Sequence, residues 1–102
     1  MAFIDFEIET NAQRYVLLVA AADRRFIEVP VANGRATAEL PPGRHRLVWS
    51  MIGRGGAAIN VVGKDGDSPV IQVKDCRIPK GESSGAGSKR FTVYDPDGDD
   101  EA

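Results

Sequence analysis

Short stretches in which apolar and polar side chains alternate restrict this chain to β structure. In residues 2–9 every second side chain is apolar, and the side chains between them are mainly acidic. Residues 44–52 repeat the pattern, with Leu47, Trp49 and Met51 on one face. Successive side chains of a strand point to opposite faces of a sheet, so the alternation predicts strands with one buried and one exposed face.

Residues that favour tight turns separate these stretches. Asn33-Gly34 is a strong hairpin signal, and residues 41–43 (Pro-Pro-Gly) and Asp65-Gly66 favour further turns. Strand character is found in eight segments: residues 2–9, 14–20, 26–31, 35–40, 44–52, 57–62, 70–73 and 89–94. Turns at roughly ten-residue intervals are typical of sandwiches or small barrels. We therefore expect an all-β, single-domain β-sandwich, Ig-like or prealbumin-like, of about seven to eight short antiparallel strands.

The segment 12–26 is the most ambiguous part of the chain. Residues 14–20 are apolar on both faces, which is typical of a strand in the middle of a sheet. Asn11, however, would suit the start of a helix, and several apolar residues also fall at helical spacing. Tyr15 and Val16 favour the strand, and the helix remains the alternative.

Two further segments differ in composition from the body of the domain, which we place in residues 1–94. Residues 79–88 are rich in glycine and serine, so we expect a flexible loop that suits a crossover between two sheets. Residues 95–102 hold five of the chain's 15 acidic residues, and we expect an acidic disordered tail. The remaining body is mildly basic, but too weakly to predict binding of nucleic acid.

Cysteine content and hydropathy bear on the compartment. The single cysteine, Cys76, excludes an internal disulfide. No apolar run is long enough to span a membrane, and the N-terminal residues do not resemble a signal peptide. We therefore expect a soluble cytoplasmic protein. Arginine outnumbers lysine, which is typical of GC-rich bacterial coding.

The stretch 31–49 contains Leu40-Pro41-Pro42-Gly43 followed by an alternating strand with Leu47 and Trp49. It resembles bacterial PEGA-type and carboxypeptidase-regulatory-like (prealbumin-like) domains, in which a hairpin ends in the same four residues. His45 stands where those domains usually have tyrosine. The resemblance implies a β-sandwich, and it implies a binding or structural module rather than an enzyme.

The residue types needed for catalysis or metal binding are scarce. His45 is the only histidine, so a site with two histidine ligands is excluded, and its parity with Leu47 and Trp49 predicts a structural position at the rim of the core. Cys76 lies near Lys74 and Arg77, a setting that favours thiolate, but an inert buried cysteine is the simpler interpretation. The spacing of the acidic residues in the tail does not match a calcium-binding loop. We expect no cofactor and no metal ion.

The remaining hypothesis is an interaction module that binds another protein, a second copy or a different chain, through a sheet face or edge. The residues that we select for such a surface are Tyr15, Leu17, Arg44, Arg46 and Arg54. An alternative is a carbohydrate or small-ligand binder that uses Trp49, Tyr94 or Tyr15. The third hypothesis, a small enzyme using Cys76 and His45, requires a tertiary contact between those two side chains.

Overall fold

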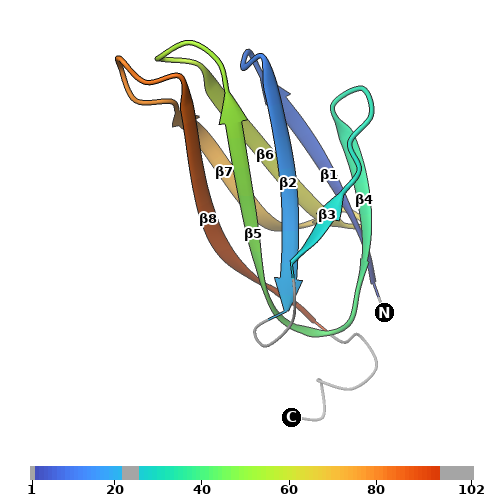
Figure 1. The fold of residues 1–102 in the computed structure, drawn as a ribbon. Coiled ribbons are helices and arrows are strands. Elements are labelled where there is room, and N and C mark those ends of the chain that lie inside the picture. Colours follow the sequence, from blue (N-terminus) through green and yellow to red (C-terminus); the bar gives the residue numbers. More distant parts are fainter. Residues whose placement is uncertain (1, 22–25, 95–102) are drawn as a thin grey trace.

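The computed structural model describes residues 2–21 and 26–94, which form eight strands in two antiparallel sheets (Figure 1). The strands are β1 (Ala2–Thr10), β2 (Arg14–Ala21), β3 (Ile27–Val29), β4 (Arg35–Leu40), β5 (Gly43–Ile52), β6 (Ala58–Asp65), β7 (Ser68–Arg77) and β8 (Ser84–Val93). The predicted all-β sandwich is confirmed. Among the described residues there is no helix that could cross a membrane.

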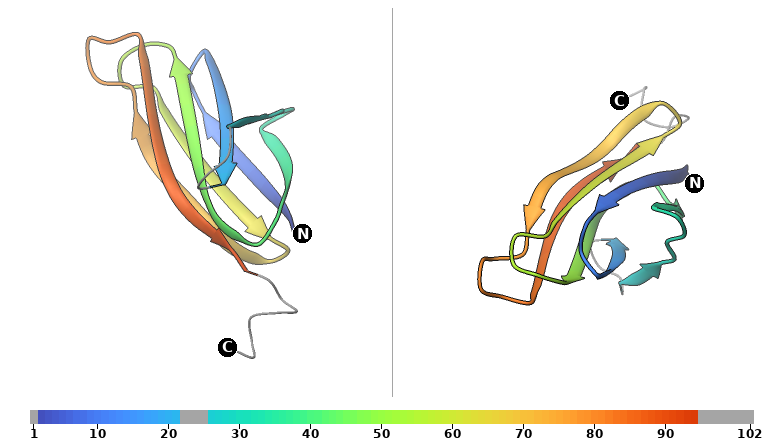
Figure 2. Two further views of the ribbon diagram at one scale, coloured as in Figure 1. Left: turned by 60° about the horizontal axis from the view of Figure 1, so that its bottom comes forward. Right: turned by 90° about the horizontal axis from the view of Figure 1, so that it is seen from above.

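Each sheet contains four strands. Sheet A has the order β4-β1-β6-β7, and sheet B has the order β3-β2-β5-β8 (Figure 2). Within a sheet, consecutive strands are neighbours only in the pairs β2–β3 and β6–β7, and the other connections cross between the sheets. The connection from β7 to β8 is one of these crossings, as the composition of the segment before β8 predicted.

The ambiguous segment is a strand where the structure describes it. β2 lies between β3 and β5 in sheet B. In a sandwich, a central strand needs apolar side chains mainly on its inner face, which packs against the other sheet. Leu17 and Val19 point inward and are buried, whereas Val16 and Leu18 point outward. The helical spacing has no structural counterpart because neighbouring strands supply the hydrogen bonds that β2 needs on both sides.

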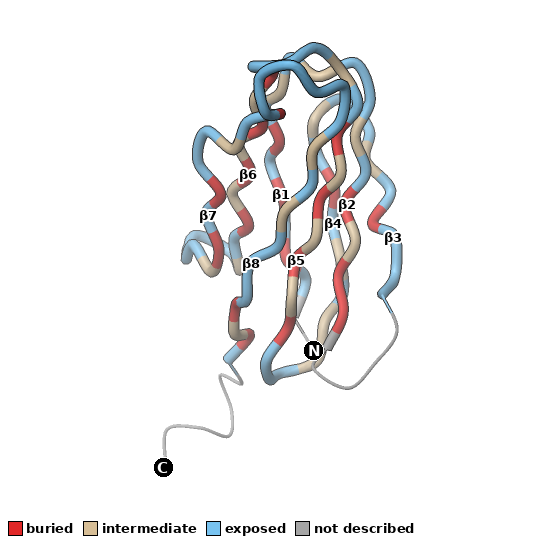
Figure 3. The backbone as a smooth tube through the Cα atoms, turned by 60° about the vertical axis from the view of Figure 1, so that its left-hand side comes forward, coloured by how far each residue is buried: buried red, intermediate tan, exposed pale blue. Residues whose placement is uncertain are grey.

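The core fills the space between the sheets with inward side chains from both layers. Figure 3 shows buried residues along strands of both sheets. Phe6 of sheet A meets Phe91 of sheet B edge to face, with ring centroids 6.5 Å apart. The largest fully buried side chains are Ile4, Phe6, Leu17, Leu47, Met51, Ile59, Val61, Ile78 and Val93. Burying one such side chain contributes about 1.5–3 kcal/mol, so the alternation in the sequence directly supplies the stability of the sandwich.

The prediction of a flexible loop over residues 79–88 is wrong for residues 84–88, because β8 begins at Ser84. The glycines of this stretch meet a packing requirement. A Cβ atom at Gly87 would lie 2.5 Å from Cζ2 of Trp49, and one at Gly85 would lie 3.3 Å from Cα of Ile78. Glycine here makes room for core side chains within a strand, and composition alone does not distinguish that role from flexibility.

Two turns predicted from sequence occur where expected but connect different sheets. Asn33 and Gly34 have φ angles of 55° and 74°, as a type I′ turn requires. The turn closes only one bridge, between Ala32 and Arg35, before β3 and β4 diverge into opposite sheets. The Pro41-Pro42-Gly43 segment likewise leads from β4 in sheet A to β5 in sheet B, so it is a crossing rather than a hairpin.

Candidate functional site

The outer face of sheet B has an uncharged apolar centre. Pairing between β2 and β5 places Leu18 opposite Val48 on the outer side. On the same side Val16 is opposite Ser50, and Ile52 is opposite Arg14 at the end of the pairing. Val16 is 39% exposed and Ile52 is 52% exposed. We call these four residues the apolar strip. Two central strands with apolar side chains on the solvent face are unusual for a sandwich, where the outer side normally alternates to polar.

Three arginines lie beyond one end of the apolar strip. Arg46 of β5 is directly opposite Arg90 of β8, and Arg44 follows on the same face, opposite Thr92. We call Arg44, Arg46 and Arg90 the arginine cluster. Among the described residues, none of the three has a carboxylate within 4.0 Å, the distance that defines an ion pair. Like charges directly opposite in a sheet are destabilising, so we expect the pair Arg46–Arg90 to lower the stability of the isolated fold.

Sheet A shows the opposite arrangement of charge on its outer face. Glu7 of β1 is opposite Arg35 of β4, and Asp5 is opposite Lys64 of β6. Opposite charges therefore face one another across neighbouring strands, which is the ordinary way in which a solvent-exposed sheet is stabilised. The arginine cluster of sheet B therefore differs from the outer face of sheet A, because two of its like charges are opposite each other.

The structure brings together two of the five residues selected from sequence. Arg44 and Arg46 share the outer face of sheet B, as strand parity predicted. Leu17 is 0% exposed and faces inward, so the selection of Leu17 as a surface residue is wrong. The alternation of β2 assigns the outward positions to Val16 and Leu18 instead. Tyr15 is half-buried and packs against the core.

Arg54 does not join the arginine cluster. It follows the end of β5, whereas Arg44 is at the start of that strand, which separates them by about 30 Å along the chain. Arg90 was missed because its position opposite Arg46 depends on the register of β5 and β8, two strands that are far apart in sequence. Arg24 and Arg25 lie outside the described residues.

His45 has a structural position at one end of the core, as its parity predicted. It is 3% exposed, its Nε2 donates a hydrogen bond to the carbonyl oxygen of Pro41 at 2.8 Å, and its ring stacks on Phe91 at 5.5 Å. Nδ1 is buried and has no hydrogen-bond partner in the described part of the chain.

Cys76 and His45 do not approach each other. The Cys76 sulfur accepts a hydrogen bond from Nε1 of Trp49 at 3.3 Å, and Trp49 lies four residues beyond His45 on β5, which is about 13 Å. The tertiary contact that the enzyme hypothesis requires is therefore missing. Each of the two side chains has a partner within the structure instead.

The aromatic residues considered for carbohydrate binding do not form one surface. Trp49 is 4% exposed, which confirms it as a core anchor and removes it as a stacking platform. Tyr94 is exposed just after β8, next to the start of β5, whereas Tyr15 pairs with Met51 near the end of β5. The two tyrosines therefore lie at opposite ends of sheet B.

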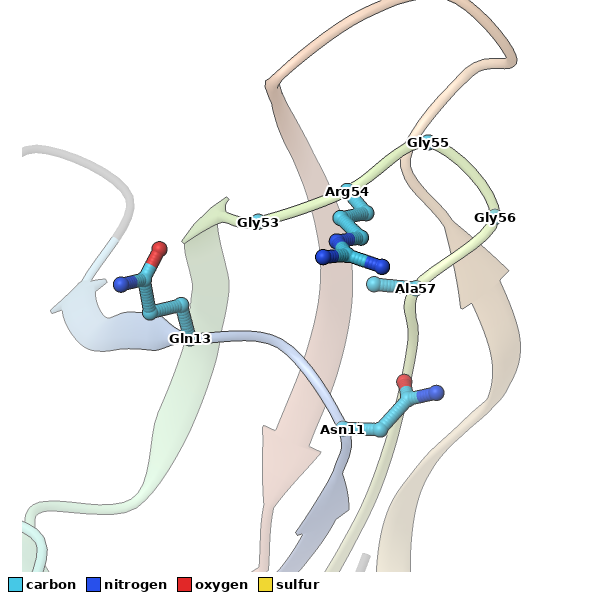
Figure 4. Close-up of a pocket in the computed structure, with 7 residues that line it drawn as sticks. All are labelled: Asn11, Gln13, Gly53, Arg54, Gly55, Gly56 and Ala57. Atoms are coloured by element: carbon cyan, nitrogen blue, oxygen red, sulfur yellow. The ribbon is translucent and has the colours of Figure 1, made fainter.

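A hollow of about 720 Å³ opens between the β1–β2 and β5–β6 connections (Figure 4). We call it the loop hollow, and it is lined by Asn11, Gln13, Gly53, Arg54, Gly55, Gly56 and Ala57. Arg54, which the sequence analysis selects for an interaction surface, is the one charged residue among the described residues that line the hollow. The loop hollow lies at the end of the sandwich opposite to the arginine cluster.

The described residues contain no group of three or more potential metal ligands. The acidic segment 95–101, considered for calcium, lies outside them. The class that the fold defines is an all-β sandwich of two four-stranded antiparallel sheets. Comparisons with protein families, with curated proteins and with solved structures find no match to this chain.

Proposed function

We propose that this protein is a non-enzymatic interaction module that binds an acidic surface of another protein through the outer face of sheet B. The observation that carries the proposal is the direct opposition of Arg46 and Arg90 beside the exposed apolar strip. A bound carboxylate between the two guanidinium groups would remove their repulsion and form charge-assisted hydrogen bonds. The repulsion between the two arginines in the free protein is then relieved in the complex, and this relief adds to the affinity and the specificity of binding.

The apolar strip favours a protein over a nucleic acid as the partner. A nucleic acid presents phosphates along its whole length, and the proteins that bind it contact these phosphates with a continuous basic surface. Here Val16, Leu18 and Val48 separate Arg14 from the arginine cluster. An apolar centre with arginine at its margin is instead the usual composition of a protein–protein interface.

Charge also favours a different chain over a second copy. By strand parity, the outer face of sheet B carries Arg14 and the arginine cluster, with Glu28 as its acidic residue among those described. Packing two such faces against each other would bring arginines together with too few carboxylates to compensate them. A partner with an acidic, partly apolar surface would bind the same face without this repulsion between arginines.

The separation of Cys76 from His45 supports the non-enzymatic part of the proposal. Both side chains are engaged within the fold, by Trp49 and by Pro41 respectively. The nucleophile and base that the third hypothesis needs are therefore not assembled in this structure.

Cross-linking in the native source, followed by mass spectrometry, tests this function. We would compare the wild-type chain with Arg46→Glu and Arg90→Glu, and with Lys74→Glu as a control of the same charge change on β7. We expect a defined protein partner to be captured by the wild type and by the control and lost in the two other variants. Denaturant unfolding of all four proteins would show that each is folded.

Three outcomes would contradict the proposal. One is capture that is equally strong for all variants, and another is a partner whose cross-linked surface is basic. The third is loss of all capture after nuclease treatment, which would establish nucleic acid as the ligand. A mixed charge-reversal experiment adds a positive test, because a carboxylate-to-lysine change in the partner should restore binding to Arg46→Glu.

A further inference from the structure

The geometry points to a second site, independent of the proposed protein interface. We propose that the loop hollow binds a small oxyanion, namely the carboxylate or phosphate group of a small molecule. The inference rests on three properties of the lining: its rigidity, the engagement of its hydrogen-bond acceptors, and the donors that this engagement leaves free. A volume of about 720 Å³ is in the range of small-molecule sites.

The loop that carries Arg54 is held firmly by its neighbours. A Cβ atom at Gly53 would lie 3.1 Å from the backbone nitrogen of Gln13, and one at Gly55 would lie 2.9 Å from that of Gly81. Hydrogen bonds join the same segments, from Gly53 N to Ser83 O at 3.0 Å and from Gly56 N to Ile78 O at 2.9 Å. The glycines therefore allow three connections to pack closely, so a ligand would meet a preformed site.

Several hydrogen-bond acceptors around the hollow are already occupied. Asn11 Oδ1 accepts from Ala58 N at 2.8 Å, and the carbonyl oxygen of Arg54 accepts from Ala57 N at 3.0 Å. The carbonyl oxygen of Gly56 accepts from Nη1 of Arg77 at 3.2 Å. These oxygens are consequently less available to a ligand that arrives as a hydrogen-bond donor.

Donors remain available in the same place. Figure 4 shows the Arg54 side chain between Gln13 and Ala57 on the side of the hollow, with the Asn11 side chain below it. With Oδ1 of Asn11 engaged, its Nδ2 is left as a donor, and the guanidinium of Arg54 supplies donors in a planar fork. Planar, bidentate recognition of carboxylate or phosphate is the typical use of arginine in such positions.

An adjoining hollow restricts the ligand to a compact anion. It has a volume of about 520 Å³, shares Asn11 with the loop hollow, and contains Glu9. A long polyanion that extended from Arg54 past Asn11 would bring negative charge toward that carboxylate. A single oxyanion held at Arg54, on a neutral or cationic molecule, avoids this repulsion.

Two-dimensional NMR titration of the ¹⁵N-labelled chain with inorganic phosphate and, separately, succinate tests the site. We expect saturable shifts of the Arg54 and Gly55 backbone amides and of the Asn11 side-chain amide with at least one of the two probes. Phosphate alone or succinate alone would identify the preferred group. Arg54→Gln should weaken binding by about tenfold or more, because it removes a charge-assisted hydrogen bond.

The controls separate this site from the arginine cluster. Arg46→Gln should leave the titration unchanged, whereas Arg54→Lys should retain part of the affinity because it keeps the charge but not the fork. Shifts that do not saturate, shifts centred on Arg46 and Arg90, or equal affinity in Arg54→Gln would each overturn the proposal. Since Arg46→Gln affects only the protein interface, failure of one proposal would leave the other unaffected.

Discussion

Gly87 lies directly opposite Trp49 in the pairing of β5 with β8, and the indole ring occupies the space that a side chain at position 87 would need. A Cβ atom there would come within 2.5 Å of Cζ2. The inner face of β8 is therefore shaped to receive the largest side chain of β5. This relationship explains why a stretch rich in glycine and serine forms a regular strand.

Gly87→Ala should destabilise the protein, because the added methyl group must displace a rigid ring in a packed core. Overpacking of this kind costs about 1–3 kcal/mol. Urea unfolding followed by circular dichroism measures the change, and Ser88→Ala on the outer face of the same strand serves as the matched control. Equal unfolding midpoints for the two variants would show that Trp49 is not held against Gly87.

Cys76→Ala should lower stability by about 1 kcal/mol, the usual net contribution of a hydrogen bond. The indole N–H of Trp49 loses its acceptor in this variant, and the ring has no other hydrogen-bonding atom with which to compensate. Cys76→Ser retains an acceptor and should lose less. Thermal unfolding of both variants checks the order, which a larger loss for Cys76→Ser would contradict.

The Cys76 thiol should react with a thiol reagent at the same rate in the wild type and in His45→Phe. About 13 Å of strand separates His45 from Trp49, to which Cys76 is hydrogen-bonded, so His45 cannot act as its base. Absorbance of the released chromophore at neutral pH gives both rates. A marked slowing in the variant would revive the enzyme hypothesis.

His45→Phe should cost about 1–2 kcal/mol, because it keeps a ring stacked on Phe91 but removes the donor to the carbonyl oxygen of Pro41. His45→Ala should cost more, since it also leaves a cavity at the end of the core. The comparison by denaturant unfolding separates the hydrogen bond from the packing. If both variants unfold at the wild-type midpoint, His45 has no structural role.

Arg90→Gln should raise stability slightly, on the order of 0.5 kcal/mol, because it relieves the opposition to Arg46. The gain should be largest at low ionic strength and decrease as salt screens the two charges. Arg44→Gln is the control, since Arg44 is opposite Thr92 and not another arginine. Unfolding curves at two salt concentrations measure the effect, and the absence of a gain at low salt would argue against the repulsion.

Local patterns in the chain were sufficient to predict most of the strands. Period-two alternation located β1 and β5. The inward position of Trp49 followed from its parity with Leu47 and Met51. These features depend on neighbours in sequence, and a strand's geometry converts them directly into faces.

Features that depend on distant residues could not be predicted in the same way. The composition of the first half of β8 predicts a loop, because the reason for its glycines is a tryptophan nearly forty residues earlier. Leu17 was assigned to a surface because both faces of β2 are apolar, and only packing shows which face is covered. The turns at residues 33–34 and 41–43 were recognised, but not the change of sheet that they make.

The sequence by itself determined the all-β class, the approximate number of strands and the inward face of most of them, because alternation and turn residues act over a few positions. The tertiary structure alone decided which strands are neighbours. Strand pairing joins segments far apart in the chain, and its register sets Arg46 opposite Arg90. It likewise brings Asn11 and Arg54 to one hollow. Both candidate sites therefore arise from pairings that no local pattern specifies.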